Sequence, residues 1–293
     1  MEIVVASGKG GTGKTFIASN LTYYVNSHVG EGVIAVDADV EAPDLLLALG
    51  GLSKELWTKE YYGAKIPEID YSKCVKCWKC LEACQFNALI KGEFGPKVLY
   101  DRCEGLGTCG IVCPQQAISF RDKKTGRLFA ALTPYDITVV TGDLEVGGGN
   151  SGRLVYELKN NAYKLSSQRR ATYLVVDAAP GIGCPVISSI RGANILIVVV
   201  EPTLQSVKGA KRLLKTAEVF KVKRFLILNK YDLNPSFSSK ISEILNAEVL
   251  GEVPYDESVV KSYSVMEPLI RYNAYSKASK ALLKILENLA EMI

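Results

Sequence analysis

The 293-residue sequence has a single histidine, no long apolar run and little excess charge. Its most apolar stretch, residues 193–200, is far shorter than the roughly 20 residues that a membrane-spanning helix needs. The net charge of +4 is too small to require nucleic acid or an anionic membrane as a partner. His28 lies where the first helix is expected to end, and we assign it no function.

A signal peptide is also missing, because a strand-like run, residues 2–6, follows Met1 directly. Residues 281–293 are apolar on one side but lack the cationic face that attracts anionic lipids, so we expect them to pack on the domain. These observations predict a soluble, cytoplasmic protein without a membrane partner. Seven of the eight cysteines lie between Cys74 and Cys113, and in such a chain this favours metal ligation over disulfides.

Apolar β-branched runs alternate with helical stretches outside the cysteine-rich segment. The expected strands are residues 2–6, 33–37, 173–177, 195–200, 224–229 and 248–253. Near-continuous apolar strands that alternate with helices indicate a parallel sheet covered on both faces. The sequence therefore predicts an α/β architecture.

The segment SGKGGTGKT, residues 7–15, lies between the first strand and a helical stretch, which is the context that a P-loop requires. Its glycines let backbone N–H groups turn toward phosphate oxygens, and the helix N-terminus adds a positive dipole. Lys14 would hold the outer phosphates and the Thr15 hydroxyl would bind Mg²⁺. The residues expected around the phosphates are Gly10, Gly11, Thr12, Gly13, Lys14 and Thr15. The alternative is a chance glycine-rich turn.

Asp177 ends a later strand, directly before the string AAPG, in the position of a Walker B carboxylate that faces the metal. An acid that caps the next turn is the alternative. Gly181 is expected to offer a backbone N–H to the terminal phosphate. Cys184, which follows in the same loop, is expected to be a small buried residue rather than a ligand.

Lys9 in the P-loop and the string DAD, Asp37 to Asp39, make the whole α/β part of the chain resemble the MinD/ParA ATPases. The resemblance implies a homodimer that sandwiches ATP, in which Lys9 reaches the partner's phosphates. It also implies that Asp39 positions the attacking water and that Asp37 lies near the Mg²⁺ shell. Phosphoryl transfer needs neutralised charge and an oriented water, which agrees with these roles. For Lys9, a solvated charge beside the loop is the alternative.

The bound base is less clear, because the string from Asn229 to Asp232 also matches the NKxD with which GTPases read guanine. In the MinD-like family the corresponding asparagine contacts adenine, together with a later loop that here contains Pro254. We expect ATP.

Cys74, Cys77, Cys80 and Cys84 have the spacing that wraps three thiolates around one iron–sulfur cluster and sends the fourth to another. The pattern repeats at an offset of 29 residues as Cys103, Cys109 and Cys113. The segment resembles the two-cluster ferredoxins, which implies that Cys113 completes a first [4Fe-4S] cluster on Cys74, Cys77 and Cys80.

By the same resemblance the second cluster would take Cys84, Cys103 and Cys109, but Leu106 stands where the fourth ligand belongs. Because leucine has no donor atom, we expect a [3Fe-4S] cluster or a [4Fe-4S] cluster with one labile iron. Structural zinc and a vacant second site are the alternatives, although zinc sites usually combine two paired-cysteine knuckles.

Together these patterns predict a P-loop NTPase with a mostly parallel, doubly wound sheet and an inserted α+β, two-cluster ferredoxin-like module. The expected boundaries are 1–66 and 122–293 for the ATPase domain and 67–121 for the insert. We expect a Mg-ATP-hydrolysing dimeric switch that acts in electron transfer or metallocluster assembly with an unidentified redox or metallocluster partner protein.

A ParA-like spatial organiser is the alternative function, with clusters that serve as structure or as a redox sensor. The stretch 205–224 is basic and could dock DNA or an acidic partner. A solvated helix face is the simpler interpretation, and nucleic acid is not an expected partner.

Overall fold

The computed structural model describes residues 1–292, which form two compact units. The first unit consists of Met1–Lys59, Leu128–Asp143 and the chain from Gly152 onward. The second unit consists of Glu60–Arg127 and Leu144–Ser151. The second unit is thus wider than the expected insert and includes a short later segment.

Within residues 1–292, the first unit is built on a nine-stranded sheet with the order β13-β12-β11-β1-β10-β2-β9-β8-β3. The strands are β1 (Glu2–Ser7), β2 (Gly32–Ala38), β3 (Lys54–Tyr61), β8 (Gly126–Leu132), β9 (Thr138–Leu144), β10 (Ala171–Pro180), β11 (Ile195–Val200), β12 (Lys223–Asn229) and β13 (Glu248–Val253). All neighbours from β13 to β9 pair in parallel. The expected α/β fold with a mostly parallel sheet is confirmed.

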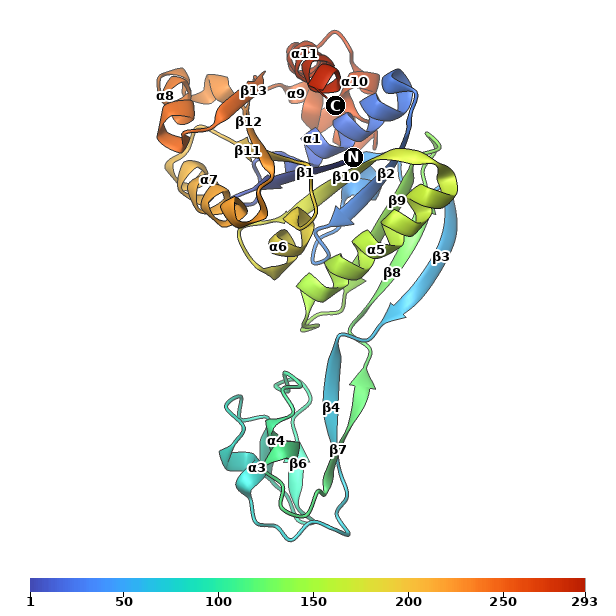
Figure 1. The fold of residues 1–293 in the computed structure, drawn as a ribbon, viewed down its shortest axis with the longest axis vertical. Coiled ribbons are helices and arrows are strands. Elements are labelled where there is room, and N and C mark those ends of the chain that lie inside the picture. The colour runs from blue at the N-terminus through green and yellow to red at the C-terminus, as the bar shows by residue number, and fades with distance from the viewer. Residues whose placement is uncertain (293) are drawn as a thin grey trace. The chain divides into compact units, whose positions relative to one another are not determined.

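Helices cover both faces of this sheet (Figure 1). Alternate residues of the central strands, such as Ile3 and Val5, pack with α1 (Lys14–Tyr24), α10 (Leu269–Tyr272) and α11 (Lys277–Met292). The opposite face meets α6 (Cys184–Ile190) and α7 (Leu204–Ala217), and α5 (Ser151–Arg169) lies on this side as well. Because both faces are buried, the central strands read as continuous apolar runs.

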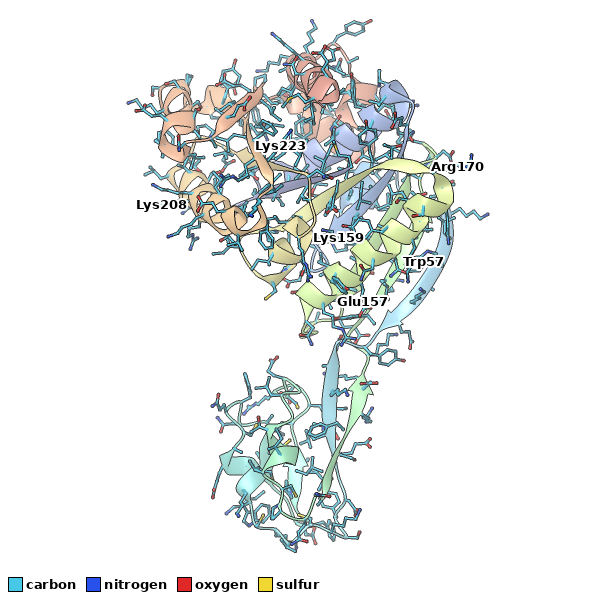
Figure 2. All side chains as sticks on the ribbon, in the orientation of Figure 1. Trp57, Glu157, Lys159, Arg170, Lys208 and Lys223 are labelled. Carbon is cyan, nitrogen blue, oxygen red and sulfur yellow. The ribbon has the colours of Figure 1, made fainter. Side chains whose placement is uncertain are left out.

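A buried ion pair fastens α5 to the start of β1. Lys159 of α5 lies 2.6 Å from Glu2, and both side chains are almost completely buried (Figure 2). Lys159 also donates to the carbonyl oxygens of Ser189 (2.7 Å) and Arg191 (2.6 Å) at the end of α6. Burial lowers the pKa of Lys159, while the Glu2 carboxylate opposes that shift.

The last helix, α11, buries Leu282, Ile285, Leu286 and Leu289 against the core. The expectation that the C-terminal segment packs on the domain therefore agrees with the structure, although Ile293 lies outside the described residues. Among residues 1–292, no helix has the combination of length and apolarity that crossing a bilayer requires.

The second unit contains two short antiparallel ladders and two single-turn helices. The ladders pair β4 (Ala64–Ile69) with β7 (Ile118–Lys123), and β5 (Leu89–Lys91) with β6 (Pro96–Val98). The helices are α3 (Lys79–Glu82) and α4 (Thr108–Ile111). Every second-half element lies 29 residues after a first-half counterpart: α4 after α3, the start of β7 after β5, and β6 after the end of β4. The internal repeat seen in the cysteines therefore extends to the backbone.

Candidate functional site

The P-loop connects β1 to α1 and has the backbone shape that its glycines predict. Gly11 and Gly13 have φ angles of 78° and 96°, which residues with a Cβ adopt at a cost. A Cβ at Gly13 would also lie 2.3 Å from Nδ2 of Asn229, whose amide donates to Thr12 O at 2.7 Å. Asn229, at the end of β12, therefore braces the loop from the neighbouring part of the sheet.

Two carboxylates meet where β2 and β10 end. Asp37 and Asp177 are register partners on these adjacent parallel strands, and both are fully buried. Burial raises the pKa of Asp177 to about 7, and burial followed by the charge of Asp177 raises the pKa of Asp37 well above its usual value. Asp37 accepts from the backbone N–H groups of Leu45 (2.9 Å) and Asp39 (3.2 Å).

Thr15, the first-turn residue of α1, points at this acidic pair. Its Oγ1 lies 2.5 Å from Asp177 Oδ2 and 3.0 Å from Asp44 Oδ1. The other oxygen of Asp177, Oδ1, is buried without a hydrogen-bond partner in the described residues. Asp44 was missed by the sequence analysis; the signal for it is an acid directly before the short helix α2 (Leu45–Ala48), which the DAD string overshadowed.

A cavity of about 470 Å³ opens beside these groups. It is lined by Gly10, Gly11, Gly13, Lys14, Thr15, Asp39, Asp44, Pro180, Asn229, Pro254, Tyr255 and Tyr263, among others. The pKa of Asp39 is raised, first by burial, and the charge of Lys14 opposes that shift. The fold thus brings most of the expected nucleotide-binding residues to one cavity.

Gly181 and Asp232 are used differently from what the sequence suggests. The N–H of Gly181 donates to Ser7 O at 2.9 Å, and its neighbour Pro180 lines the cavity instead. The carboxylate of Asp232 accepts from the backbone N–H of Tyr255 at 2.6 Å, which ties it to the loop after β13.

Lys9 forms an ion pair that sequence reasoning did not anticipate. Its Nζ lies 2.5 Å from Glu201 Oε1, at the end of β11. Glu201 also contacts Lys230 at 3.3 Å, and Lys230 donates to Gly11 O at 3.0 Å. The Glu201 side chain is buried, and Lys9 and Lys230 help to lower its pKa although burial opposes them. Glu201 was hidden in the sequence because it is a lone acid after an apolar strand.

The cysteines of the second unit gather around two separate cavities. Cys74, Cys77, Cys80 and Cys113 line one, together with Val75 and Trp78. Cys84, Cys103 and Cys109 line the other, together with Leu106. These are the two groups that the spacing predicts. The described residues hold no set of three or more Cys, His, Asp or Glu side chains around a single-ion position.

The thiols at both cavities are free, and matching backbone N–H groups point at two of them. Ala88 N lies 3.3 Å from Cys84 Sγ, and Ala117 N lies 3.3 Å from Cys113 Sγ. Burial raises the pKa of the Cys80 thiol to about 11 and also raises that of Cys109. Hydrogen bonds to sulfur stabilise the thiolate form, which burial alone disfavours.

Cys184 differs from its expectation. It is exposed at the first position of α6 rather than buried, because Gly152 of α5 packs against its backbone and leaves the sulfur outside.

Comparison with known proteins gives the same assignment for the first unit. Residues 3–269 match the family model described as the CobQ/CobB/MinD/ParA nucleotide binding domain. An uncharacterised protein of Methanocaldococcus jannaschii is 31% identical, over 100% of this chain and 98% of its own. An uncharacterised ATP-binding protein of that organism is 30% identical, over 97% and 96%.

Among solved structures, the septum site-determining protein MinD of Pyrococcus horikoshii, complexed with Mg-ADP, shares the fold. Its TM-score is 0.62 at 16% identity, over 99% of this chain and 96% of that one. Because the family model covers most of the chain and the P-loop geometry agrees with it, this protein belongs to the CobQ/CobB/MinD/ParA nucleotide-binding domain family.

Proposed function

We propose that this chain is a Mg-ATP-hydrolysing dimeric switch whose inserted segment, residues 67–121, binds two iron–sulfur clusters and acts in electron transfer or metallocluster assembly. One observation carries the cluster half: the two cysteine groups predicted from spacing line two separate cavities. Family membership and the P-loop cavity support the nucleotide half.

Each group around the P-loop cavity has a distinct task in this proposal. Lys14 and the loop N–H groups hold the phosphates, since both line the cavity. Asp39 lines the same cavity without a second task in α1, and it orients the attacking water. Phosphoryl transfer depends on this kind of positioning and charge stabilisation more than on covalent chemistry.

The residues beneath the phosphates fit Mg²⁺. Asp177 has a buried oxygen without a partner, and Thr15 lies directly against its other oxygen. Asp37 crowds the same place, and a divalent cation would relieve the repulsion that helps raise its pKa. When bound, Mg²⁺ neutralises charge on the phosphate oxygens. Thr15 and Asp177 would hold it, with Asp37 behind them.

Adenine is the favoured base. A guanine-reading aspartate must present a free carboxylate, whereas that of Asp232 accepts from Tyr255 N and lies 3.6 Å from Lys277. The cavity wall near Asn229 is formed instead by Pro254, Tyr255 and Val259. An apolar wall of this kind favours a stacked base without selecting the guanine edge, and GTP should compete poorly in calorimetry.

The cysteine cavities fit iron–sulfur clusters better than zinc. A zinc ion needs its thiolates at about 2.3 Å from one point, and the described residues provide no such group. In a cluster each thiolate binds a different iron, so the sulfurs stay further apart. Four cysteines line the first cavity and three line the second, where Leu106 takes the fourth position. When present, the clusters supply one-electron redox chemistry.

One experiment tests both halves together. Protein is purified without oxygen, iron and sulfide are counted, and steady-state ATPase is measured with the clusters oxidised and reduced. We expect iron in excess of one cluster per chain and a turnover rate that depends on redox state. Iron-free protein with unchanged ATPase would reject the cluster half alone, and absence of ATPase would reject the nucleotide half.

A ParA-like organiser remains the second candidate, because the basic side chains of α7, including Lys208, Lys211, Arg212 and Lys215, are exposed. Figure 2 shows Lys208 on this helix. If the helix binds DNA, the ATP form should bind duplex DNA with an affinity that falls steeply with salt. ATP-dependent, salt-sensitive binding that Lys211→Ala weakens would favour this second function.

A further inference from the structure

The internal repeat lets the two cysteine cavities be compared position by position. Trp78 before α3 and Gly107 before α4 occupy the same place, with φ angles of 62° and 79°. Lys76 and Gly105 likewise match, at 52° and 70°. Since the backbones agree, differences between the cavities come from the side chains.

Those side chains close one cavity and leave the other open. Val75 and the half-buried Trp78 line the first cavity, whereas the equivalent lining residues of the second are Glu104 and Gly107. The centre of a water molecule can occupy about 20 Å³ of the first cavity and about 200 Å³ of the second. Roughly 10–15 Å³ of such space holds one water, so the first cavity is nearly closed and the second admits several.

The open cavity is also the one that lacks a thiol. Leu106 replaces the counterpart of Cys77, and its side chain is 67% exposed at the rim. Missing ligand and missing cover therefore coincide, which a chance loss of one cysteine would not explain.

We infer that the second cavity is a port through which one ferrous ion exchanges with solution, and that Gly107 keeps this port open. The inference rests on the proposed cluster-binding function. Cys84, Cys103 and Cys109 retain the three other irons while the ion at the Leu106 corner enters or leaves as Fe²⁺. The core charge then changes by that of the ion, and no electron is needed. The ligand class is a hydrated divalent cation, bound at a site without its own protein thiolate.

Conformation alone does not explain the glycine. Trp78 adopts the same left-handed conformation in the first half. A Cβ at Gly107 would meet only Phe120 Cζ, at 3.8 Å, which is an ordinary contact. A tryptophan at position 107 is therefore compatible with the backbone and would restore the cover that the first cavity has.

The test measures iron release from anaerobically reconstituted protein to a colourimetric ferrous chelator. The original chain should show a fast phase of one iron per chain. Gly107→Trp should slow that phase roughly tenfold, a barrier increase of about 1.4 kcal/mol. Gly107→Ala is the matched control, because it imposes the same backbone restriction without covering the cavity, and it should keep the fast phase.

Trp78→Gly separates access from ligation. It opens the first cavity, yet Cys77 still binds that corner, so no second fast iron should appear. An unchanged fast phase in Gly107→Trp, with its total iron preserved, would overturn the port while leaving the clusters intact. A chain that takes up no iron on reconstitution would instead overturn the proposed function. Nucleotide binding by each variant checks that the first unit is folded.

Discussion

Lys14 and Asp39 line the same cavity, but their burial and surroundings suit different tasks. Lys14 is 7% exposed at the first position of α1, where its ammonium and the helix dipole act on the same phosphates. Asp39 follows β2 and is less buried, in a position to polarise a water. A side chain that binds the ground state and one that acts in the transition state respond differently to removal.

We therefore expect Lys14→Ala to lose nucleotide binding and Asp39→Ala to keep it. Loss of a positioned proton acceptor typically costs about 10²–10⁴-fold in rate, so Asp39→Ala should hydrolyse ATP at least about a hundredfold more slowly. Calorimetry and phosphate release measure the two effects. Normal turnover in Asp39→Ala would remove the role assigned to that residue.

Leu106 gives a second residue-scale prediction. Because the second cavity has three thiols, air-exposed protein should give the electron paramagnetic resonance signal of a three-iron cluster. Leu106→Cys adds the missing thiolate and should convert it to a second four-iron cluster. Two air-stable four-iron clusters in the original chain would mean that another group supplies the ligand.

At the scale of elements, α7 approaches β1 through a pair of glycines. A Cβ at Gly8 would lie 2.0 Å from Gly209 C, and a Cβ at Gly209 would lie 2.6 Å from Gly8 O. The obstacles are backbone atoms, so α7 itself would have to shift. The helix that carries the basic face is thus held against the P-loop by the absence of two side chains.

Gly209→Ala should therefore destabilise the protein by about 1–3 kcal/mol, the usual cost of overpacking. Thermal unfolding measures this loss. Gly183→Ala is the matched control, because its Cβ would meet only Pro185 Cδ at 3.6 Å, and it should unfold at nearly the original temperature. Equal melting temperatures for Gly209→Ala and the original chain would contradict the close approach.

The strand pair β2 and β10 makes stability depend on pH. The folded state keeps the Asp177 proton up to about pH 7, whereas an unfolded aspartate releases it near pH 4. Between these values the unfolded state binds fewer protons, so nucleotide-free protein should lose stability as pH rises from about 4 to 7. The raised pKa of Asp37 acts with the same sign.

The melting temperature of nucleotide-free protein, measured across this window, checks the prediction. Asp177→Asn cannot ionise and should flatten the slope. Saturating Mg-ADP should also reduce it, because a bound cation favours the ionised carboxylates. An identical slope in Asp177→Asn would show that other groups control the pH response.

At the scale of the whole molecule, nucleotide and cysteine sites belong to different compact units. Lys9 is held by Glu201 within its own chain, although the MinD/ParA resemblance assigns it to a partner's phosphates. Dimerisation must therefore break this ion pair, and Mg-ATP is the ligand expected to favour the exchange.

Mg-ATP should convert Asp39→Ala protein, in which hydrolysis is blocked, from monomer to dimer in analytical ultracentrifugation. Adding Lys9→Ala should leave it monomeric with nucleotide still bound. Lys211→Ala, on the exposed face of α7, is the control and should not affect the dimer. A dimer that forms equally well without Lys9 would reject its role across the interface.

Six strands expected from apolar runs correspond to β1, β2, β10, β11, β12 and β13, and β11 and β13 agree to the residue. Strands β3, β8 and β9 were not anticipated. β3 lies at the sheet edge and carries Lys54, Glu55, Lys59 and Glu60, which protects an edge but removes the apolar signal of a strand.

The sequence by itself determined the P-loop, the acidic string after β2 and the two cysteine groups. Each depends on torsion angles or ligand spacing over a few consecutive residues, which local sequence controls. Tertiary structure alone decided that Glu201 pairs with Lys9, that Asp44 joins Thr15, that Asp232 binds the Tyr255 backbone and that Cys184 is exposed. These contacts depend on strand order and helix packing, which join residues distant in the chain.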